Sequence, residues 1–199
     1  MARCRVLTNP FSFKEKINVD IENLLPKREC LDLEIGFGRG VFINSYAKKY
    51  KDRNIIGLDI RKFVVDECNE KFKNQGFDNV LFLLGEANIC LDDMFKNNSI
   101  DKIFIFHPDP WAKTKHRKRR LIQKDFLDRV FKKLKSDGRM YITTDVEELW
   151  TYMSKTIKEH NKFKTVDDEY FFREDYVTDW HSYSVKQDKN IFFGAFEKI

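Results

Sequence analysis

Acidic side chains and glycines gather at the ends of three short apolar runs, where they could hold a small polar ligand. These residues are Glu34, Gly36, Gly38, Gly40, Asp59, Glu86, Ala87 and Asn88. Glycine lets the backbone turn tightly and approach a ligand closely, and a carboxylate accepts hydrogen bonds from hydroxyl and amine groups. If the apolar runs are parallel strands of one sheet, these residues meet at the same sheet edge. The sequence therefore predicts a ligand site there.

The spacing of the glycines indicates which ligand fits the site. They fall at alternate positions after Glu34 and so depart from the G-x-G-x-x-G pattern that binds dinucleotides. A pyrophosphate favours a helix N-terminus clear of negative charge, whereas Glu34 suits a cationic amine, such as the amino-acid end of S-adenosylmethionine. Asp59 could accept hydrogen bonds from two ribose hydroxyls, and residues 86–88 could reach the adenine edge. We predict S-adenosylmethionine as the cofactor, with a nicotinamide cofactor as the alternative.

A second stretch capable of chemistry runs from Ile103 to Arg120. Four apolar residues precede His-Pro-Asp-Pro-Trp at 107–111, and the two prolines require a rigid loop. Six cations follow, namely Lys113, Lys115, Arg117, Lys118, Arg119 and Arg120. Asp109 and Trp111 at a strand end beside this run indicate a site that faces a polyanion, with a solvated helix start as the alternative. Trp111 either stacks on a base or packs beneath the loop.

The overall composition is that of one folded domain with a local positive charge. The 199 residues are 42% hydrophobic and 15% aromatic, which excludes a disordered chain, and the net charge is +5. Without the six cations of 113–120 the net charge would be −1, so the positive charge belongs to a site. Four cysteines without a C-x-x-C pair, at positions 4, 30, 68 and 90, predict reduced thiols, no metal site and a cytoplasmic protein. We also expect no secretory signal and no membrane span.

Alternating strands and helices predict the fold. Strands are expected at 30–35, 54–60, 80–84, 103–106 and 139–144. Amphipathic helices are expected between them, including a strong one over 121–134 that ends before a turn at Asp137-Gly138. Two further strands, 163–172 and 190–196, are expected to pair antiparallel across the polar segment 173–189. The predicted fold class is α/β, a doubly wound, mostly parallel sheet with an antiparallel C-terminal strand. It forms one domain over 30–199, after a lead-in over 1–29.

With these residues in view, the chain resembles the tRNA (guanine-N7)-methyltransferases of the bacterial single-chain type. The most specific similarity is the segment Pro-Asp-Pro-Trp-x-Lys-x-x-His-x-Lys-Arg-Arg over 108–120. The Leu-Glu-Ile-Gly-Phe-Gly-Arg-Gly loop at 33–40, Thr144-Asp145 and a segment that begins at Thr178 match further family features. Other methyltransferases share the ligand loop but not the segment at 108–120. The resemblance covers most of the chain and implies a class I, Rossmann-like methyltransferase.

The resemblance also implies roles for individual residues. The cofactor site would be lined by Glu34, Asp59, Glu86 and Asp109, with Asp109 nearest the chemistry. The tRNA would be held by Lys113, Asp145 and the segment Thr178-Asp179-Trp180-His181, and the basic run adds Lys115, Arg117 and Arg120 as phosphate contacts. The family usually has glutamate where this chain has His181, and a neutral histidine accepts only one hydrogen bond. Either Asp179 recognises the guanine, or guanine is recognised differently here.

These roles predict methyl transfer from S-adenosylmethionine to N7 of a guanine in the variable loop of tRNA. N7 carries a lone pair and no proton, so an in-line displacement needs no general base. Positioning, and the acids Asp109 and Asp145 near the developing positive charge, would promote the step. The alternatives are a methyltransferase of another RNA and a non-catalytic RNA-binding protein on this fold. A nicotinamide oxidoreductase would need a catalytic Tyr-Lys or His pair that the sequence does not place. Both a monomer and a homodimer are compatible with the sequence.

Overall fold

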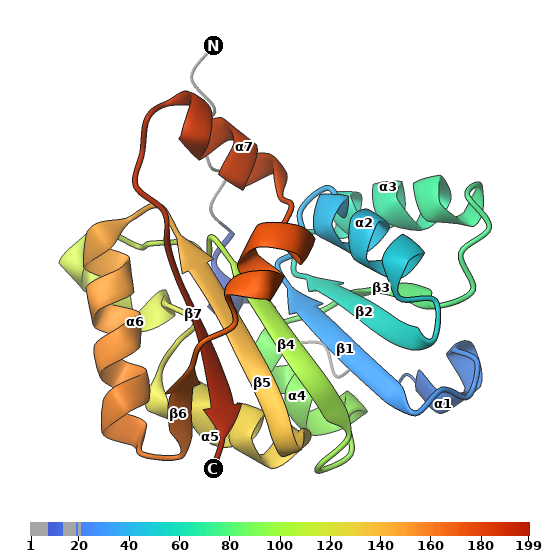
Figure 1. Ribbon diagram of the computed structural model, residues 1–199, viewed down its shortest axis with the longest axis horizontal. Coiled ribbons are helices and arrows are strands. Elements are labelled where there is room, and N and C mark those ends of the chain that lie inside the picture. The colour runs from blue at the N-terminus through green and yellow to red at the C-terminus, as the bar shows by residue number, and fades with distance from the viewer. Residues whose placement is uncertain (1–7, 14–18, 20) are drawn as a thin grey trace.

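The computed structural model describes residues 8–13, 19 and 21–199, and the predictions for Cys4 and for most of residues 1–20 lie outside this part of the chain. In the described residues, seven strands form one sheet in the order β3-β2-β1-β4-β5-β7-β6 (Figure 1). The strands are β1 Cys30–Ile35, β2 Arg53–Asp59, β3 Val80–Leu84, β4 Ile100–Phe106, β5 Leu134–Thr144, β6 Phe163–Val166 and β7 Phe192–Lys198. Strands β1 to β5 pair in parallel, whereas β7 is antiparallel to both of its neighbours. The predicted fold class is confirmed.

Helices cover both faces of the sheet (Figure 1). The α-helices are α1 Ile21–Leu24, α2 Val41–Lys49, α3 Lys62–Lys73, α4 Ala87–Met94, α5 Lys124–Lys133, α6 Glu147–His160 and α7 Asp179–Lys186. Shorter elements are the 3-10 helices η1 Pro10–Ser12 and η2 Thr114–Arg119 and the π-helical turn η3 Phe171–Asp175. One core, with α2, α3 and η3, surrounds Phe42 and Phe104. The other, with α1, α4, α5 and α6, surrounds Leu91 and Leu127. The molecule is therefore a three-layer α/β/α structure.

The strand order brings the candidate site residues together. The C-terminal ends of the five parallel strands lie along one edge, and the strand order reverses between β1 and β4. Ligands of open α/β sheets bind at such a reversal because the connecting loops diverge there and leave a crevice. The loops after Ile35, Asp59, Leu84 and Phe106 all leave the sheet at this edge.

The turn predicted at Asp137-Gly138 is wrong. Both residues lie inside β5, which begins at Leu134. The pairing of β5 with β4 shifts register between Ile100 and Lys102, so the additional residues are accommodated as a bulge in a continuous strand. A Cβ atom on Gly138 would lie 3.0 Å from the Leu134 side chain, which explains a glycine at this bulge.

The strand predicted over 163–172 is also wrong beyond its first residues. Strand β6 ends at Val166, and Phe171 turns into the core, where its ring centroid lies 4.2 Å from that of Tyr141. Burial of this aromatic ring outweighs the local β propensity of the segment. The segment 173–189, predicted only as a polar connection, contains α7. Thr178 caps this helix, because its Oγ1 accepts a hydrogen bond of 2.9 Å from the His181 backbone N–H.

Three further observations concern the described residues as a whole. None of their helices is both long enough and apolar enough to cross a membrane. Cys30, Cys68 and Cys90 are free cysteines. Residues 8–13, 19 and 21–199 hold no group of three or more His, Cys, Asp or Glu side chains that could bind a metal ion.

Candidate active site

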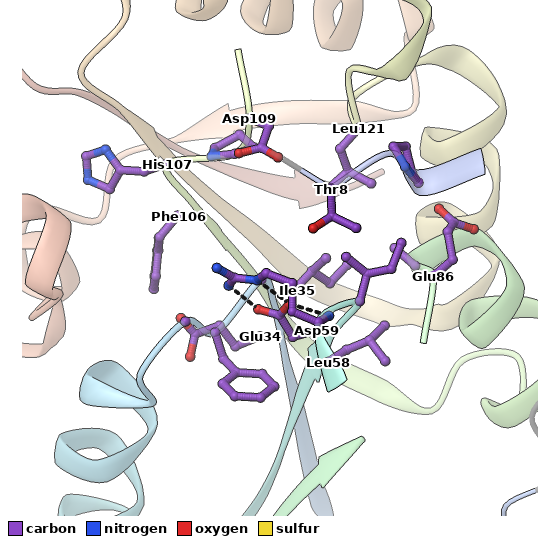
Figure 2. Close-up of a pocket in the computed structure, with 18 of the residues that line it drawn as sticks. Thr8, Glu34, Ile35, Leu58, Asp59, Glu86, Phe106, His107, Asp109 and Leu121 are labelled. Atoms are coloured by element: carbon purple, nitrogen blue, oxygen red, sulfur yellow. Dashed lines mark hydrogen bonds and ion pairs between the residues drawn. The ribbon is translucent and has the colours of Figure 1, made fainter. Parts of the chain in front are cut away.

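A cavity of about 870 Å³ opens at the C-terminal ends of β1 to β4 (Figure 2). Many of the predicted site residues line it. These are Glu34, Gly36, Gly38, Asp59, Glu86, Ala87, Asn88, Asp109, Arg120, Thr178 and Asp179. The remaining predicted residues are not among its lining residues, and these are Gly40, Lys113, Lys115, Arg117, Asp145 and His181. The cavity thus joins the predicted cofactor residues to Asp109 and to the start of α7.

The three glycines after Glu34 divide into two roles. Gly36 and Gly38 have φ values of +80° and +57°, and a Cβ atom on either would meet no atom within 4 Å, because both border the open cavity. Gly40 has a φ of +67°, and a Cβ atom there would lie 3.2 Å from the Phe72 ring. The first two glycines therefore keep the ligand side of the loop open, and Gly40 lets the start of α2 pack against α3.

Glu34 is the buried acid of the cavity. It is only 3% exposed, and its Oε2 has no hydrogen-bond partner among the described residues. Burial, with a further contribution from the nearby Asp59 carboxylate, raises the pKa of Glu34 to about 8. An unsatisfied buried carboxyl group beside a cavity is suited to a cationic donor from a ligand, which would favour the ionised form.

Asp59 already has a partner that the sequence analysis missed. The Arg61 guanidinium donates to both oxygens of Asp59, with Nε–Oδ1 at 2.8 Å and Nη2–Oδ2 at 2.6 Å, and the Arg61 backbone N–H donates to Oδ1 at 3.0 Å. Each carboxylate oxygen has two acceptor sites, so ribose hydroxyls must either share Asp59 with Arg61 or displace it. An arginine two residues after the predicted ribose acceptor was the signal available in the sequence.

Glu86 uses its carboxylate to start α4. Its Oε2 accepts hydrogen bonds from the backbone N–H groups of Asn88 and Ile89, at 3.0 and 3.2 Å. Its Oε1 accepts from the Asn88 side-chain amide at 2.9 Å. The carboxylate is therefore an N-cap that also borders the cavity. Contact between these residues and the adenine edge stays a prediction.

The loop after β4 presents Asp109 to the cavity and buries Trp111. Figure 2 shows Asp109 apart from Glu34 and Asp59, which lie close together. Trp111 is buried, and the Arg119 guanidinium lies over its ring at 4.9 Å from the centroid. Of the two alternatives for Trp111, the structure shows packing beneath the loop.

The basic run separates into exposed cations and one buried anchor. Lys113, Lys115 and Lys118 are exposed, and they flank or belong to η2. The Arg120 side chain is 2% exposed, and it donates from Nε to the Pro110 carbonyl at 2.9 Å and from Nη2 to Glu148 at 2.8 Å. Arg120 therefore anchors the loop that follows β4. Its contact with a tRNA phosphate stays a prediction.

Helix α7 brings Thr178 and Asp179 to the cavity but turns His181 elsewhere. The His181 ring packs edge-on against Tyr176 with a centroid distance of 4.9 Å, and burial lowers the pKa of this imidazole. Asp145 is likewise not among the residues that line the cavity. Its side chain is 1% exposed and accepts a hydrogen bond of 3.1 Å from Ser184 of α7. Direct tRNA contacts of His181 and Asp145 stay predictions.

Comparison with known proteins assigns the family. Residues 28–192 match a family model described as "Putative methyltransferase". A tRNA (guanine-N(7)-)-methyltransferase of Prochlorococcus marinus (strain NATL1A) is 33% identical over 193 residues, which cover 92% of this chain and 87% of that protein. The chain belongs to the tRNA (guanine-N7)-methyltransferase family. Another relative of the same description, from Salmonella typhimurium (strain LT2), is 30% identical over 150 residues, 75% of this chain and 63% of that protein. The resemblance read from the sequence is confirmed.

Solved structures agree with this family fold. A SAM-dependent methyltransferase from Aquifex aeolicus has a TM-score of 0.60 at 14% identity, covering 90% of this chain and 87% of that chain. An antibiotic-related methyltransferase has a TM-score of 0.62 at 18% identity, covering 97% and 99%. At these identities the similarity concerns the fold alone, which is that of class I methyltransferases.

In this member of the tRNA (guanine-N7)-methyltransferase family, the structure adds cavity residues that the sequence analysis did not single out. Thr8, Pro10 and Phe11 line the cavity, although they belong to the lead-in for which no role was predicted. Arg61 also lines it. No spacing in the sequence connects the lead-in to the sheet edge, because the contact depends on how the chain returns in space.

Proposed function

We propose that this protein transfers the methyl group of S-adenosylmethionine to N7 of a guanine in the variable loop of tRNA. The observation that carries the proposal is one continuous cavity. It joins the buried Glu34 and the glycine loop to Asp109 and to the start of α7, in a chain whose relatives are tRNA (guanine-N(7)-)-methyltransferases. Of the exposed lysines of η2 and its flanks, Lys118 lines this cavity, and the group suits a polyanionic substrate.

The residues of the cofactor side fit S-adenosylmethionine. Glu34 offers to the cationic amine its Oε2, which has no hydrogen-bond partner among the described residues. Asp59 offers carboxylate oxygens to the ribose, and Gly36 and Gly38 leave room for close approach. When bound, this cofactor supplies an electrophilic methyl group on a sulfonium centre. The carboxylates of Glu34 and Asp59 would favour that cation by electrostatics in a partly enclosed cavity.

The chemical task of the protein is positioning. Guanine N7 has a lone pair and no proton, so no side chain needs to act as a general base, and we assign no such role to His107 or His116. The Asp109 carboxylate, on the rigid loop that Arg120 clamps, would hold the guanine and stabilise the positive charge that develops on the purine. We therefore propose Asp109 as the catalytic residue.

Guanine recognition is the point at which this chain departs from its family. A carboxylate accepts from both the N1–H and the N2 amino group of guanine, whereas a neutral imidazole accepts one hydrogen bond. Asp179 lines the cavity, and His181 packs against Tyr176 with a lowered pKa that keeps it neutral. We assign guanine recognition to Asp179, with Thr178 fixing the start of α7.

Phosphates of the tRNA would meet the exposed cations. Lys113, Lys115 and Lys118 support this contact because their side chains are exposed. Arg117 is partly engaged with Glu148 at 3.0 Å and is 48% exposed, so it is available to a stronger anion. We place the protein in the cytoplasm, in keeping with the free cysteines of the described residues.

Product analysis tests the proposed function. The purified protein is incubated with labelled S-adenosylmethionine and unmodified tRNA, and the nucleosides of the digested tRNA are separated. We expect the label in N7-methylguanosine. Label in another nucleoside would show that the protein methylates a different atom. Transfer to ribosomal RNA but not to tRNA would favour the alternative of a methyltransferase of another RNA.

A further inference from the structure

Helix α7 and the loop that carries Asp109 are joined by a buried hydrogen-bond network centred on His107. The His107 side chain is buried, with Nε2 at 2.6 Å from the Tyr176 hydroxyl and Nδ1 at 3.4 Å from Asp145 Oδ1. Figure 2 shows the His107 ring turned away from the centre of the pocket. The two ring nitrogens thus contact side chains from two other segments, one after β5 and one before α7.

Asp145 connects this network to α7. Its Oδ2 accepts from the Ser184 hydroxyl and from the Lys189 ammonium, each at 3.1 Å. Ser184 lies in the second half of α7, and Lys189 follows the helix. A buried carboxylate is stable only where donors surround it, so removing one donor weakens the whole arrangement.

Tyr176 connects the network to the residues that lead into α7. Its hydroxyl also lies 3.0 Å from the Thr143 hydroxyl of β5, and its ring packs 4.9 Å from that of His181. A carboxylate only accepts hydrogen bonds, so His107 contacts Asp145 through a protonated Nδ1, and in its neutral form it would accept at Nε2 from the Tyr176 hydroxyl. The His107 imidazole therefore connects Asp145 and Tyr176 to the end of β4.

The backbone of His107 is held as firmly as its side chain. Its φ is +49°, in the left-handed region, and its N–H donates to the Thr143 carbonyl at 2.8 Å. A residue other than glycine keeps this conformation only where its surroundings impose it. Asp109 follows two residues later, and Asp179 opens α7; both line the cavity. The network therefore sets the position of one cavity wall relative to the other.

We propose that His107 is a positioning residue, which holds α7 against the Asp109 loop so that Asp179 and Asp109 face the same guanine. The inference rests on the proposed function, and it adds Tyr176 and Asp145 as the partners through which His107 acts. The hydrogen bonds of this network join the ends of β4 and β5 to Tyr176 and to α7, and their partners do not include Glu34 or the glycine loop. The network should therefore govern the use of tRNA and leave the binding of S-adenosylmethionine unchanged.

Steady-state kinetics of three variants test this role. At saturating S-adenosylmethionine, we expect His107→Ala to raise KM for tRNA and to lower kcat/KM by about ten-fold or more. Tyr176→Phe removes one hydroxyl and keeps the ring, so a smaller change in the same direction is expected. His107→Asn is the matched control, because asparagine tolerates a left-handed backbone and can donate to Asp145, and it should restore most of the KM.

Two further measurements separate positioning from mere loss of stability. Calorimetry should give an S-adenosylmethionine Kd for His107→Ala within about two-fold of the wild type, because the cofactor side has its own contacts. Amide hydrogen exchange should be faster across residues 179–186 in His107→Ala and in Ser184→Ala, and unchanged in α3. A variant that is only less stable would lose active protein and keep its KM.

The outcomes also separate this inference from the proposed function. If the wild type fails to methylate tRNA while α7 exchange responds to His107→Ala, the proposed function is wrong and the connection between the two walls stands. If the wild type methylates tRNA while His107→Ala keeps the wild-type KM and the wild-type exchange of α7, the positioning role of His107 is overturned.

Discussion

The two halves of the pocket are held together in different ways. In the cofactor half, at the ends of β1 to β3, Asp59 is fixed by Arg61, two residues further along the chain. In the substrate half, at the ends of β4 and β5, His107 is fixed by Tyr176, which lies 69 residues away. The first half is built from residues that are close in sequence, at the ends of three strands. The second half is built from segments that are far apart in sequence. Substitutions in the first should act on the ligand alone, whereas those in the second should also displace neighbouring elements.

The halves also differ in charge. The cofactor half gathers buried acids, of which Glu34 is the extreme case, and its ligand is expected to bring the compensating cation. The substrate half is bordered by exposed lysines that suit a polyanion. Asp109 and Asp179 bring negative charge into this half, where the purine becomes positive during transfer. The cofactor half is therefore suited to a cationic ligand, whereas the substrate half combines cations for phosphates with acids for the purine.

The largest effect is expected at Asp109, the acid on the substrate half that faces the chemistry. Asp109→Ala should lower the single-turnover rate of methyl transfer by about a hundred-fold or more, because it removes the charge nearest the developing cation. The affinity for tRNA, measured by filter binding, should stay within about two-fold. Asp109→Asn keeps the shape and serves as the matched control for the loss of charge alone. A variant that turns over at the wild-type rate would remove Asp109 from the mechanism.

Guanine recognition should depend on Asp179 and not on His181. Asp179→Asn should lower kcat/KM by about ten- to a hundred-fold, since an amide can accept only one of the two guanine hydrogen bonds. The wild type should discriminate against a tRNA transcript with inosine at the target position, because inosine lacks the N2 amino group. Asp179→Asn should lose most of that discrimination, and His181→Ala should keep it. If His181→Ala lost the discrimination and Asp179→Asn kept it, His181 would be the residue that recognises guanine.

Glu34 should make cofactor binding depend on pH. With a pKa of about 8 in the free protein, its carboxyl must lose a proton to accept a cationic amine. The affinity for S-adenosylmethionine should rise by about ten-fold per unit between pH 6 and 8, as calorimetry can measure. Glu34→Gln should weaken binding and flatten this dependence. If the affinity of Glu34→Gln depended as steeply on pH, the proton would be lost from another group.

The same raised pKa has the opposite effect on the stability of the free protein. Between the ordinary pKa of 4.5 and about 8, the folded state holds a proton on Glu34 that the unfolded state has lost. The free energy of unfolding should therefore fall as pH rises through this window. At pH 8 and without ligand, Glu34→Gln should have a higher Tm than the wild type. The Glu34 carboxyl would then lower the stability of the free protein while it favours cofactor binding.

Arg120 and Arg117 provide a matched pair for the long-range contacts of the substrate half. Both form an ion pair with the same oxygen of Glu148, but the Arg120 side chain is 2% exposed and that of Arg117 is 48% exposed. Arg120→Ala should lower the free energy of unfolding by about 2 kcal/mol, because it leaves the Pro110 carbonyl without its donor. Arg117→Ala should cost less than about 0.5 kcal/mol. Equal losses in urea unfolding would contradict the anchoring role of Arg120.

The smallest effects are expected from the exposed lysines. Lys113→Ala and Lys115→Ala should each weaken tRNA binding several-fold at low salt and less at high salt. Each lost phosphate contact should reduce the slope of log Kd against log salt by about one. Lys51→Ala, at an exposed position after α2, serves as the control and should leave the slope unchanged. A loss of affinity that is independent of salt would exclude phosphate contact at 113 and 115.

The sequence predicts the cofactor half well because that half is local. Apolar runs that end in glycines or acids show where strands stop and which side chains meet at the sheet edge. The strand Cys30–Ile35 has its predicted bounds, and Gly36, Gly38, Asp59 and the residues 86–88 all line the cavity. Arg61 was missed because its position two residues after Asp59 does not by itself show that its side chain turns back to the carboxylate.

The substrate half is less predictable because exposure there depends on distant partners. In the sequence Arg120 is one more cation of a basic run, yet its side chain is buried and donates to Glu148, 28 residues away. Asp145 reads as a strand-end acid, yet Ser184 and Lys189 close over it. The course of residues 163–172 is set by the packing of Phe171 on Tyr141, which no local pattern reveals.

The most direct test of the central claim replaces the reacting atom itself. A tRNA transcript whose variable-loop guanine is 7-deazaguanine, with a C–H group in place of N7, is compared with the unmodified transcript as a methyl acceptor. We expect methyl transfer from labelled S-adenosylmethionine to fall to background, while the binding of the tRNA is retained. Transfer to the deaza transcript at the normal rate would show that the methyl group goes elsewhere, and would contradict the assignment of N7.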